Sequence, residues 1–398
     1  MRFFYPFSAA FLIFCGGHIY VGARAMAYLR LSAPLAQGFL AWLLYAFIAF
    51  SYFIGMYLGG SLMGSLCRLI GGYWLIAFVY ILIGFAAADI ALLAIRLIAP
   101  APVWQTVRSF MKMAGVIILS CSLALVVYGS FHARRIATAR YKIGSVRLAG
   151  VSAGESLRIG LISDLHIGAS VDLKWLTNIV NSLNEGAPDI VVIAGDIFDN
   201  NLSAIEDLRL YSDVLKKIGA KYGVYAVLGN HDVDRVSFRA ASNDASPASV
   251  SSAGGGIRAF FNDCGVRLLE DETLLIDGRF YIAGRKDAAP IGARDHSRLS
   301  EDALLAGWDK ALPLILVNHR PEGIAEAVDR GVDLLLAGHT HRGQIFPARY
   351  ITRAMFDLDY GYKRIGDTHV VVSSGAGLWG PPVRVGTDSE VVLIDYEW

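Results

Sequence analysis

Cysteine is scarce in this sequence, and the few that occur do not suggest a disulfide framework. The 398-residue chain has four cysteines. Cys15, Cys67 and Cys121 lie in the first third, which leaves Cys264 alone in the C-terminal part. A single cysteine cannot form an internal bridge, so the C-terminal part is compatible with a reducing compartment. We expect its chemistry to use side chains other than thiols.

The chain also lacks an excess of charge of either sign. It has 36 Lys and Arg against 35 Asp and Glu, a formal net charge of +1. There is no basic stripe and no aromatic stacking motif of the kind that nucleic-acid-binding proteins use. We therefore expect no nucleic-acid partner.

Charged residues are especially few before about residue 132, although 55% of the whole chain is hydrophobic. A membrane-spanning helix needs about 20 mainly apolar residues. The first such run has only Arg2 before it and further runs after it, so we interpret it as an uncleaved helix rather than a signal peptide. We predict that residues 1–132 are a transmembrane anchor of about four helices, over Phe3 to Gly22, Gly38 to Leu58, Leu69 to Ile95 and Met113 to Phe131.

The basic residues near the ends of these runs give an orientation. Four crossings would put both chain ends on one side, and that side has six Lys and Arg residues against five on the other. The positive-inside rule then predicts a cytoplasmic C-terminal domain, and a miscount of one helix would reverse this result. The six are Arg2, Arg68, Arg134, Arg135, Arg140 and Lys142; the five are Arg24, Arg30, Arg96, Arg108 and Lys112.

Two polar residues, His18 and Asp89, lie within the apolar runs. A carboxylate inside a membrane is costly, so Asp89 could serve a transport path or hold a lipid headgroup. The alternative, which we favour, is that Asp89 hydrogen-bonds inside the helix bundle.

After a linker at residues 133–141, residues 142–398 are long enough for a complete domain. Strand-like and helical stretches alternate in its first half, which predicts an α/β fold. Short strands return in the last third, so we expect two sheets packed face to face. The Gly- and Ser-rich residues 242–256 are typical of a flexible loop. We expect strands over Leu157 to Ser163, Ile190 to Ala194, Val224 to Leu228, Leu314 to Val317, Val370 to Ser373 and Glu390 to Asp395, and helices around Asp172 to Asn184 and Leu202 to Ile218.

Five apolar, strand-like runs in this domain each end in a polar group that can bind metal. Side chains that leave the carboxyl ends of neighbouring strands converge in one crevice. Each group alone could be incidental, but five in one domain favour a common metal site. Oxygen and nitrogen ligands without thiolates suit Mn, Fe or Zn. The groups are Asp164-Leu165-His166, Gly195-Asp196-Ile197-Phe198-Asp199, Gly229-Asn230-His231-Asp232, Asn318-His319 and Gly338-His339-Thr340-His341.

This ordered set resembles the motifs of the calcineurin-like metallophosphoesterases. The tail Ser374 to Arg384 is also similar to the bacterial membrane-associated branch of that family. The resemblance implies a β-sandwich flanked by helices, with two divalent metal ions (Mn, Fe or Zn) between the strand ends. It also implies an integral membrane protein of a bacterial inner membrane.

Carried over position by position, the resemblance implies a role for each residue. Asp196 would bridge the two metals, and a metal-bridging hydroxide would attack phosphorus. His231 would protonate the leaving oxygen, oriented by Asp199, although Asp199 could instead cap a turn or helix. Arg320 and Arg342 flank ligand positions and could contact substrate phosphate or be surface arginines. The implied ligands are Asp164, His166 and His341 for one metal and Asn230, His319 and His339 for the other.

These features together predict a membrane-anchored phosphoesterase that cleaves phosphodiester or pyrophosphate bonds. The phosphate ester substrate is expected to be lipid-linked or nucleotide-linked, since an anchor gives access to lipid headgroups. A phosphomonoesterase, including a protein phosphatase, on the same site is an alternative. A catalytically silent membrane scaffold is another, although no implied ligand is missing. The segment Val233 to Phe238 lacks the aromatic and glycine pattern of the membrane branch, so the substrate stays open.

Overall fold

The computed structural model divides the chain into two compact units, Met1–Ser130 and Phe131–Trp398. The residues that it describes are 4–29, 35–59, 61–148, 154–168, 171–199, 205, 207–232, 247–287 and 298–398, with backbone only for 4–10, 35–37 and 247–255.

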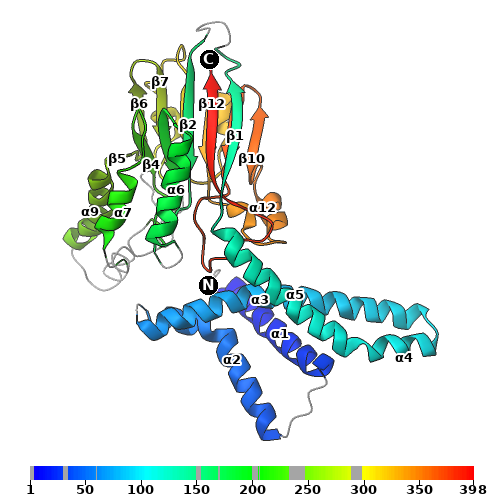
Figure 1. Cartoon of the computed structure of the whole chain (residues 1–398). Helices are drawn as coiled ribbons and strands as arrows, with labels where there is room; N and C mark the ends of the chain where they lie inside the picture. Colours follow the sequence, from blue (N-terminus) through cyan, green and yellow to red (C-terminus); the bar gives the residue numbers. More distant parts are fainter. Residues whose placement is uncertain are drawn as a thin grey trace. The chain divides into compact units, whose positions relative to one another are not determined.

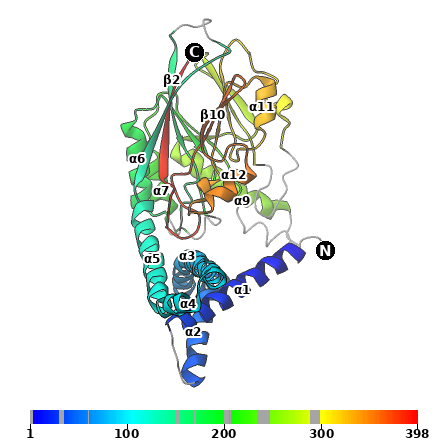
Figure 2. The same cartoon turned by 90° about the vertical axis from the view of Figure 1, so that its right-hand side faces the viewer.

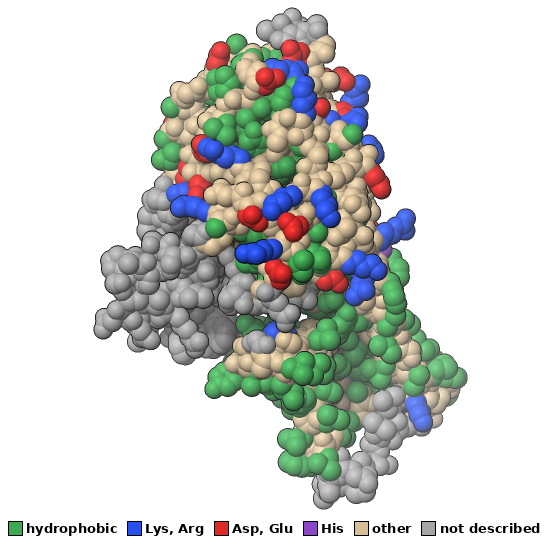
Figure 3. All heavy atoms as spheres, turned by 60° about the vertical axis from the view of Figure 1, so that its left-hand side comes forward, with side chains coloured by type: hydrophobic (Ala, Val, Ile, Leu, Met, Phe, Trp, Pro, Cys, Tyr) green, Lys and Arg blue, Asp and Glu red, His purple; other side chains and the backbone are tan. Residues whose placement is uncertain are grey.

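The described residues of the N-terminal unit form helices joined by short connections. Its visible face is mostly hydrophobic in Figure 3, whereas charged side chains are scattered over the other unit. Among the described residues, Gly38–Tyr57, Leu62–Ile98 and Met111–Ala133 are long and apolar enough to cross a membrane. The helices are α1 (Phe4–Leu29), α2 (Leu35–Tyr57), α3 (Leu62–Ile98), α4 (Ala101–Ser109) and α5 (Met111–Ala133), the last continuing into the second unit.

Three candidate spans thus occur in the described residues where about four were predicted. The first predicted span, Phe3 to Gly22, falls on α1, and the side chains of its first residues lie outside the described part. An odd number of crossings would put the chain ends on opposite sides. The cytoplasmic placement of the C-terminal domain therefore stays a prediction.

Asp89 hydrogen-bonds inside the helix bundle, as we favoured. Its carboxylate on α3 lies 2.7 Å from Nε of Arg24 on α1. It also accepts hydrogen bonds from the hydroxyls of Tyr20, at 2.6 Å, and Tyr28. Three donors from one neighbouring helix stabilise the charge of this carboxylate. The contacts explain its presence in the bundle without a transport role.

The second unit is built on two six-stranded sheets, drawn in Figure 1. In both sheets most neighbouring strands are parallel. The first sheet has the order β1 (Ile136–Gly144), β12 (Ser389–Glu397), β2 (Ser156–Ile162), β3 (Ile190–Ala194), β4 (Val224–Val227), β5 (Val266–Leu268). The second has the order β10 (Gly361–Ile365), β11 (Thr368–Val372), β9 (Leu334–Ala337), β8 (Leu314–Val317), β7 (Phe280–Gly284), β6 (Glu272–Ile276).

The sheets pack face to face, as Figure 2 shows edge-on, and strand β3 illustrates why. Ile190 and Val192 point into the core between the sheets, whereas Val191 and Ile193 point into a second core under the helices. Alternate residues of a strand face opposite sides, so a strand covered on both faces is apolar throughout. All five residues of β3 are buried.

Helices cover the outer face of each sheet, which confirms the predicted α/β sandwich. Helix α6 begins after Asp172, whose side chain accepts a hydrogen bond from the backbone N–H of Trp175. Such an N-cap satisfies a donor that the helix cannot pair itself. The first sheet is covered by α6 (Leu173–Glu185), α7 (Leu208–Leu215) and α9 (Pro247–Cys264), the second by α10 (Glu301–Leu304) and α11 (Ile324–Arg330); η2 (His341–Gly343) and α12 (Arg349–Met355) follow β9.

Two stretches differ from the sequence-based expectation. Most of the expected linker 133–141 belongs to β1, because Ala139 and Tyr141 alternate into the core while β1 pairs with β12. The expected loop 242–256 was wrong from Pro247 onward, where α9 begins. Proline suits a first helical turn, and burial of Phe260 and Phe261 later in α9 stabilises the helix.

Candidate metal centre

The candidate ligands all follow the carboxyl ends of strands. β2, β3 and β4 are neighbouring parallel strands of the first sheet, and β8 and β9 are neighbouring parallel strands of the second. The polar groups after them are therefore carried to one end of each sheet. Side-chain contacts between the two sheets place both ends together, so five strands supply one site.

One group of candidate ligands is formed by Asp164, His166 and His341. Nε2 of His341 lies 3.6 Å from Oδ1 of Asp164 and 3.2 Å from Nε2 of His166. All three residues are buried. Two imidazoles and a carboxylate that converge in this way are the donor set of a Mn, Fe or Zn site.

A second group is formed around His319 on the loop after β8. Nε2 of His319 lies 3.2 Å from Oδ2 of Asp196. It is also 3.1 Å from both Oδ1 of Asn230 and Nδ1 of His339. The four side chains therefore point at one another from four different strand ends, and all four were among the predicted ligands.

Asp196 lies between the two groups. Its Oδ2 is 3.8 Å from Nε2 of His166 in the first group, as well as 3.2 Å from His319 in the second. The other carboxylate oxygen accepts a hydrogen bond from the backbone N–H of His231 at 2.8 Å, which fixes the side chain. This is the position that a carboxylate shared by two cations would need.

The ring of His319 is oriented for a cation. Its Nδ1 donates to the carbonyl oxygen of Ala194 at 2.9 Å, which leaves Nε2 facing Asp196. Burial alone would lower the pKa of His319, but the Asp196 carboxylate outweighs this effect and raises it to about 10. The site thus favours positive charge at Nε2, and a divalent cation can provide that charge in place of the proton.

The other imidazoles are held neutral. Burial lowers the pKa of His166 and of His339 to about 3, and it lowers that of His341 well below the ordinary value. Neutral imidazole is the form that binds metal. The donor chemistry therefore fits divalent metal ions at both groups.

Backbone strain is concentrated at the same residues. Five of the seven candidate ligands have φ in the left-handed region, which costs non-glycine residues about 1–3 kcal/mol each. The buried carboxyl ends of the strands before them, β2, β3 and β9, hold these turns in place. The φ values are 54° for Asp164, 46° for His166, 52° for Asp196, 73° for His339 and 48° for His341.

Two glycines in the motifs are required by close packing against ligands. A Cβ at Gly338 would overlap the carboxylate of Asp164, and a Cβ at Gly229 would overlap that of Asp196. These distances explain why glycine comes directly before the ligand-bearing residues in both motifs.

We expect Gly338→Ala to weaken metal binding by about tenfold to hundredfold, the usual effect of disturbing the groups that hold a ligand in place. The added methyl group must displace Asp164 or open the site. Metal content after dialysis, measured by mass spectrometry, tests this. Gly307→Ala is the matched control, because a Cβ there meets nothing within 4 Å. Equal metal content in both variants would contradict the packing argument.

His231 and Asp199 lie beside the first group. Ligand atoms of His166, Asp199 and His231 are within 4.8 Å of one another. The His231 ring packs edge-on against that of His166, with centroids 5.1 Å apart. His231 is half-buried, so its ring borders the metal groups and solvent at once. The two residues predicted to act together are thus neighbours.

Asp232 has a structural role that the sequence left open. Its Oδ1 accepts from the backbone N–H groups of Ile197 and Phe198 at 2.8 and 2.9 Å, and its Oδ2 accepts from Gly229 at 2.8 Å. The side chain therefore joins the loop after β3 to the loop after β4. Asp196 and Asn230 stand on those two loops.

Asp232→Asn should lower the unfolding temperature and weaken metal binding about tenfold. The amide replaces one acceptor oxygen by a donor, and an unpaired buried group costs about 1–3 kcal/mol. Thermal unfolding and metal titration measure the two effects. Asp277→Asn, on an exposed turn, is the control. A variant indistinguishable from this control would show that Asp232 does not hold the loops.

Arg384 is a further residue that sequence reasoning did not assign. It is fully buried, and its Nη2 donates to the carbonyl oxygens of Ser374, Gly375 and Gly377 at 2.8, 3.1 and 2.9 Å. The same nitrogen lies 3.5 Å from Nδ1 of His341. Arg384 thus fixes the tail loop beneath a candidate ligand. The signal was the tail motif itself, which ends at this arginine.

The two arginines predicted to contact substrate have different surroundings. Nε of Arg320 lies 3.0 Å from the carboxylate of buried Asp287. Arg342 lies over the ring of Tyr360, 4.2 Å from its centroid, and lines a cavity of about 660 Å³. Arg342 is therefore the better placed of the two to meet an anion.

Comparison with known proteins agrees with this geometry. Residues 157–343 match the calcineurin-like phosphoesterase family. An uncharacterized metallophosphoesterase of Aquifex aeolicus is 30% identical over 245 residues, which cover 61% of this chain and 85% of that protein. The chain belongs to the calcineurin-like metallophosphoesterases. The resemblance inferred from the motifs is thereby confirmed.

Two longer relatives extend the family comparison. An uncharacterized metallophosphoesterase of Campylobacter jejuni is 30% identical, over 61% of this chain and 59% of its own length. A transmembrane protein with metallophosphoesterase domain of Danio rerio is 31% identical, over 70% of this chain and 62% of its own length. The matched region thus spans about three fifths of these two metallophosphoesterases. Together with the three apolar helices, the second relative indicates a membrane protein.

Proposed function

We propose that this metallophosphoesterase is a membrane-anchored phosphoesterase with a dinuclear metal centre, which hydrolyses phosphodiester or pyrophosphate bonds of a lipid-linked substrate. The observation that carries the proposal is the position of Asp196. Its carboxylate reaches the ligand group of His166 and that of His319 within 3.8 Å. Two cations sharing that carboxylate would form the symmetric clamp used in phosphoryl transfer.

The metal ions, when bound, supply Lewis acidity that activates water and neutralises phosphoryl charge. The residues of the chain hold this centre rigid. Asp164, His166 and His341 would hold one cation, and Asn230, His319 and His339 would hold the other. Apart from the half-buried His339, these side chains are buried, and the exclusion of water strengthens their electrostatic effect on the substrate.

His231 acts as the general acid in this proposal. Its half-buried ring borders the metal groups, so it can give a proton to the leaving oxygen. Asp199 orients the ring in this proposal, since ligand atoms of the two residues lie within 4.8 Å of one another. Arg342 and Arg320 contact the phosphoryl oxygens, with Arg342 the stronger candidate.

The apolar helices of the same chain support a lipid-linked substrate. They anchor the enzyme in the membrane, which we assign to a bacterial inner membrane with the catalytic domain in the cytoplasm. Anchoring concentrates the site at lipid headgroups, where a soluble enzyme would have to find them by diffusion. Residues 1–132 serve as the anchor and residues 142–398 as the catalytic domain.

The full chain in detergent, loaded with Mn or Zn, tests the proposal on bis(p-nitrophenyl) phosphate and p-nitrophenyl phosphate. We expect metal-dependent cleavage, with higher kcat/KM for the diester. A preference for the monoester would instead support a phosphomonoesterase. No cleavage of either ester by protein that holds two metals would contradict the proposed activity.

A further inference from the structure

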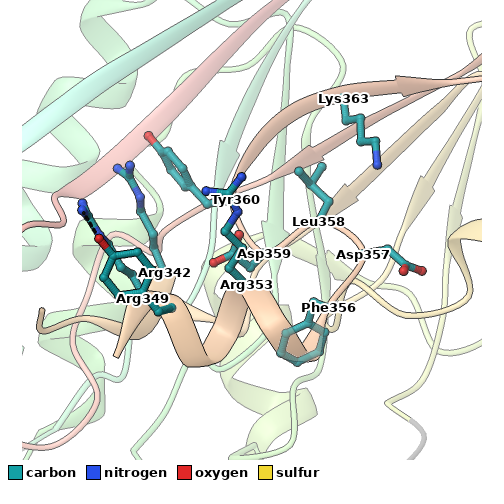
Figure 4. A pocket seen from close by; sticks show the side chains of 10 residues that line it. Arg342, Arg349, Arg353, Phe356, Asp357, Leu358, Asp359, Tyr360 and Lys363 are labelled. Carbon is teal, nitrogen blue, oxygen red and sulfur yellow. Dashed lines mark hydrogen bonds between the residues drawn. The ribbon is translucent and has the colours of Figure 1, made fainter. Parts of the chain in front are cut away.

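Apart from Arg342, the residues that line a cavity beside the metal centre have no role in the chemistry above. Its volume is about 660 Å³, and the segment from Arg342 to Lys363 lines it. Three guanidinium groups, those of Arg342, Arg349 and Arg353, rise on the same side of α12 in Figure 4. Lys363 adds a fourth cation to the lining. We call this cavity the arginine pocket.

The arginine pocket is joined directly to the candidate ligands. Arg342 follows His341 in the chain. The hydroxyl of Thr340, between the two histidines of the motif, donates to the carbonyl oxygen of Asp359 at 2.6 Å. Phe356 packs edge-on against the ring of His339, with centroids 6.0 Å apart. A substrate bound at the metal centre would therefore have the pocket next to it.

The pocket carries an excess of positive charge. Its lining has four cations against two carboxylates, Asp357 and Asp359. Within the described part of the chain, no carboxylate lies within 4.0 Å of the cationic groups of the lining. Asp359 instead accepts a hydrogen bond from the Thr352 hydroxyl at 2.7 Å.

Aromatic contacts, rather than carboxylates, hold two of these arginines. Arg342 lies over the Tyr360 ring, and Arg349 lies 5.0 Å from the Tyr350 ring centroid with one N–H bonded to its hydroxyl at 3.2 Å. A stacked guanidinium keeps most of its in-plane donors, which can bind a phosphate with two parallel hydrogen bonds.

The size of the pocket favours more than one anionic group on the substrate. Ligand sites usually measure about 300–1,000 Å³. A phosphate held by the metals would lie at the edge of the pocket and leave the arginines of α12 without an anion. Resting on the proposed function, we propose that the arginine pocket binds a second phosphate of the substrate, distinct from the one that is cleaved.

The shared chemistry is a phosphate group, and it can come from a soluble or a lipid-linked molecule. Turnover of three substrates by the full chain separates these sources. Bis(p-nitrophenyl) phosphate carries one phosphate, a dinucleoside diphosphate carries two in a soluble molecule, and a prenyl-linked nucleoside diphosphate in micelles carries two on a lipid. A higher kcat/KM for the third than for the second would identify the lipid source, and equal values the soluble one.

The pocket itself is tested by Arg349→Gln combined with Arg353→Gln. Each lost charge-assisted hydrogen bond costs about tenfold or more. We therefore expect the kcat/KM ratio of two-phosphate to one-phosphate substrate to fall at least about tenfold. Arg364→Gln on β10 is the control, because Arg364 is exposed, pairs with Asp367 and is absent from the lining. An unchanged ratio in the double variant would overturn the proposal.

A binding measurement separates failure of the pocket from failure of the proposed activity. Inorganic pyrophosphate is titrated calorimetrically into the full chain after chelator treatment, so that metals contribute nothing. We expect at least about tenfold weaker binding in the double variant and wild-type binding in Arg364→Gln. If pyrophosphate binding changes as expected but neither ester is cleaved, the proposed activity is refuted and the arginine pocket is supported. Cleavage with equal pyrophosphate binding in all three proteins would refute the pocket and keep the activity.

Discussion

Asp196→Asn is expected to abolish hydrolysis of a chromogenic phosphodiester and to release metal from both positions. The substitution keeps the size of the side chain but removes the negative charge that lies between the two ligand groups. In the proposed centre both cations would lose a ligand at once, so the loss should exceed the about tenfold to hundredfold effect of disturbing an outer contact. Metal content and kcat/KM of the same preparation measure it.

Two controls accompany this prediction. Asp277→Asn makes the same chemical change on an exposed turn and should leave metal content and turnover at the wild-type level. Asp196→Asn should also unfold at a temperature close to that of chelated wild type. An Asp196→Asn protein that keeps two metals per chain would show that this carboxylate does not bridge them.

His231→Ala is expected to keep both metals and to slow turnover by about a hundredfold or more, the range for loss of a general acid. The ring lies beside the candidate ligands, and its ligand atom is within 4.8 Å of those of Asp199 and His166. A group that protonates the leaving oxygen matters most when that oxygen is a poor leaving group. The loss should therefore be larger for an alkyl phosphodiester than for a p-nitrophenyl diester.

The pair with Asp199 gives a second test of that role. If Asp199 acts only by orienting His231, the double variant His231→Ala with Asp199→Asn should be no slower than His231→Ala alone. Additive losses would assign Asp199 a separate task. Loss of metal from the single His231→Ala variant would make this histidine a ligand rather than an acid.

Much of the C-terminal fold could be predicted because its central strands carry strong local signals. The expected runs Ile190 to Ala194 and Leu314 to Val317 are β3 and β8 with the same bounds. Both are buried on two faces, so every residue is apolar and the run ends where the polar motif begins. β5 was not predicted, because a three-residue edge strand is fixed by pairing with the distant β4 rather than by its own pattern.

The residues of the candidate centre were accessible to sequence reasoning for a related reason. A polar group directly after an apolar run marks the carboxyl end of a strand, and in parallel sheets these ends meet. The contacts that support the centre have no comparable sequence pattern. Asp232 looks like any turn aspartate until the loops it joins are folded, and Arg384 reaches His341 from 43 residues away.

By itself, the sequence determined the family, the order of the motifs, the apolar helices and the identity of the candidate ligands, since each depends on residue type and local spacing. Tertiary structure alone decided that Asp196 stands between two ligand groups, that Asp89 is compensated inside the bundle, and that four cations from Arg342 to Lys363 line one cavity. The first depends on the packing of the two sheets and the second on the packing of α1 against α3, each of which joins residues far apart in the chain. The third depends on how α12 and the loops beside it fold. No local residue pattern determines any of them.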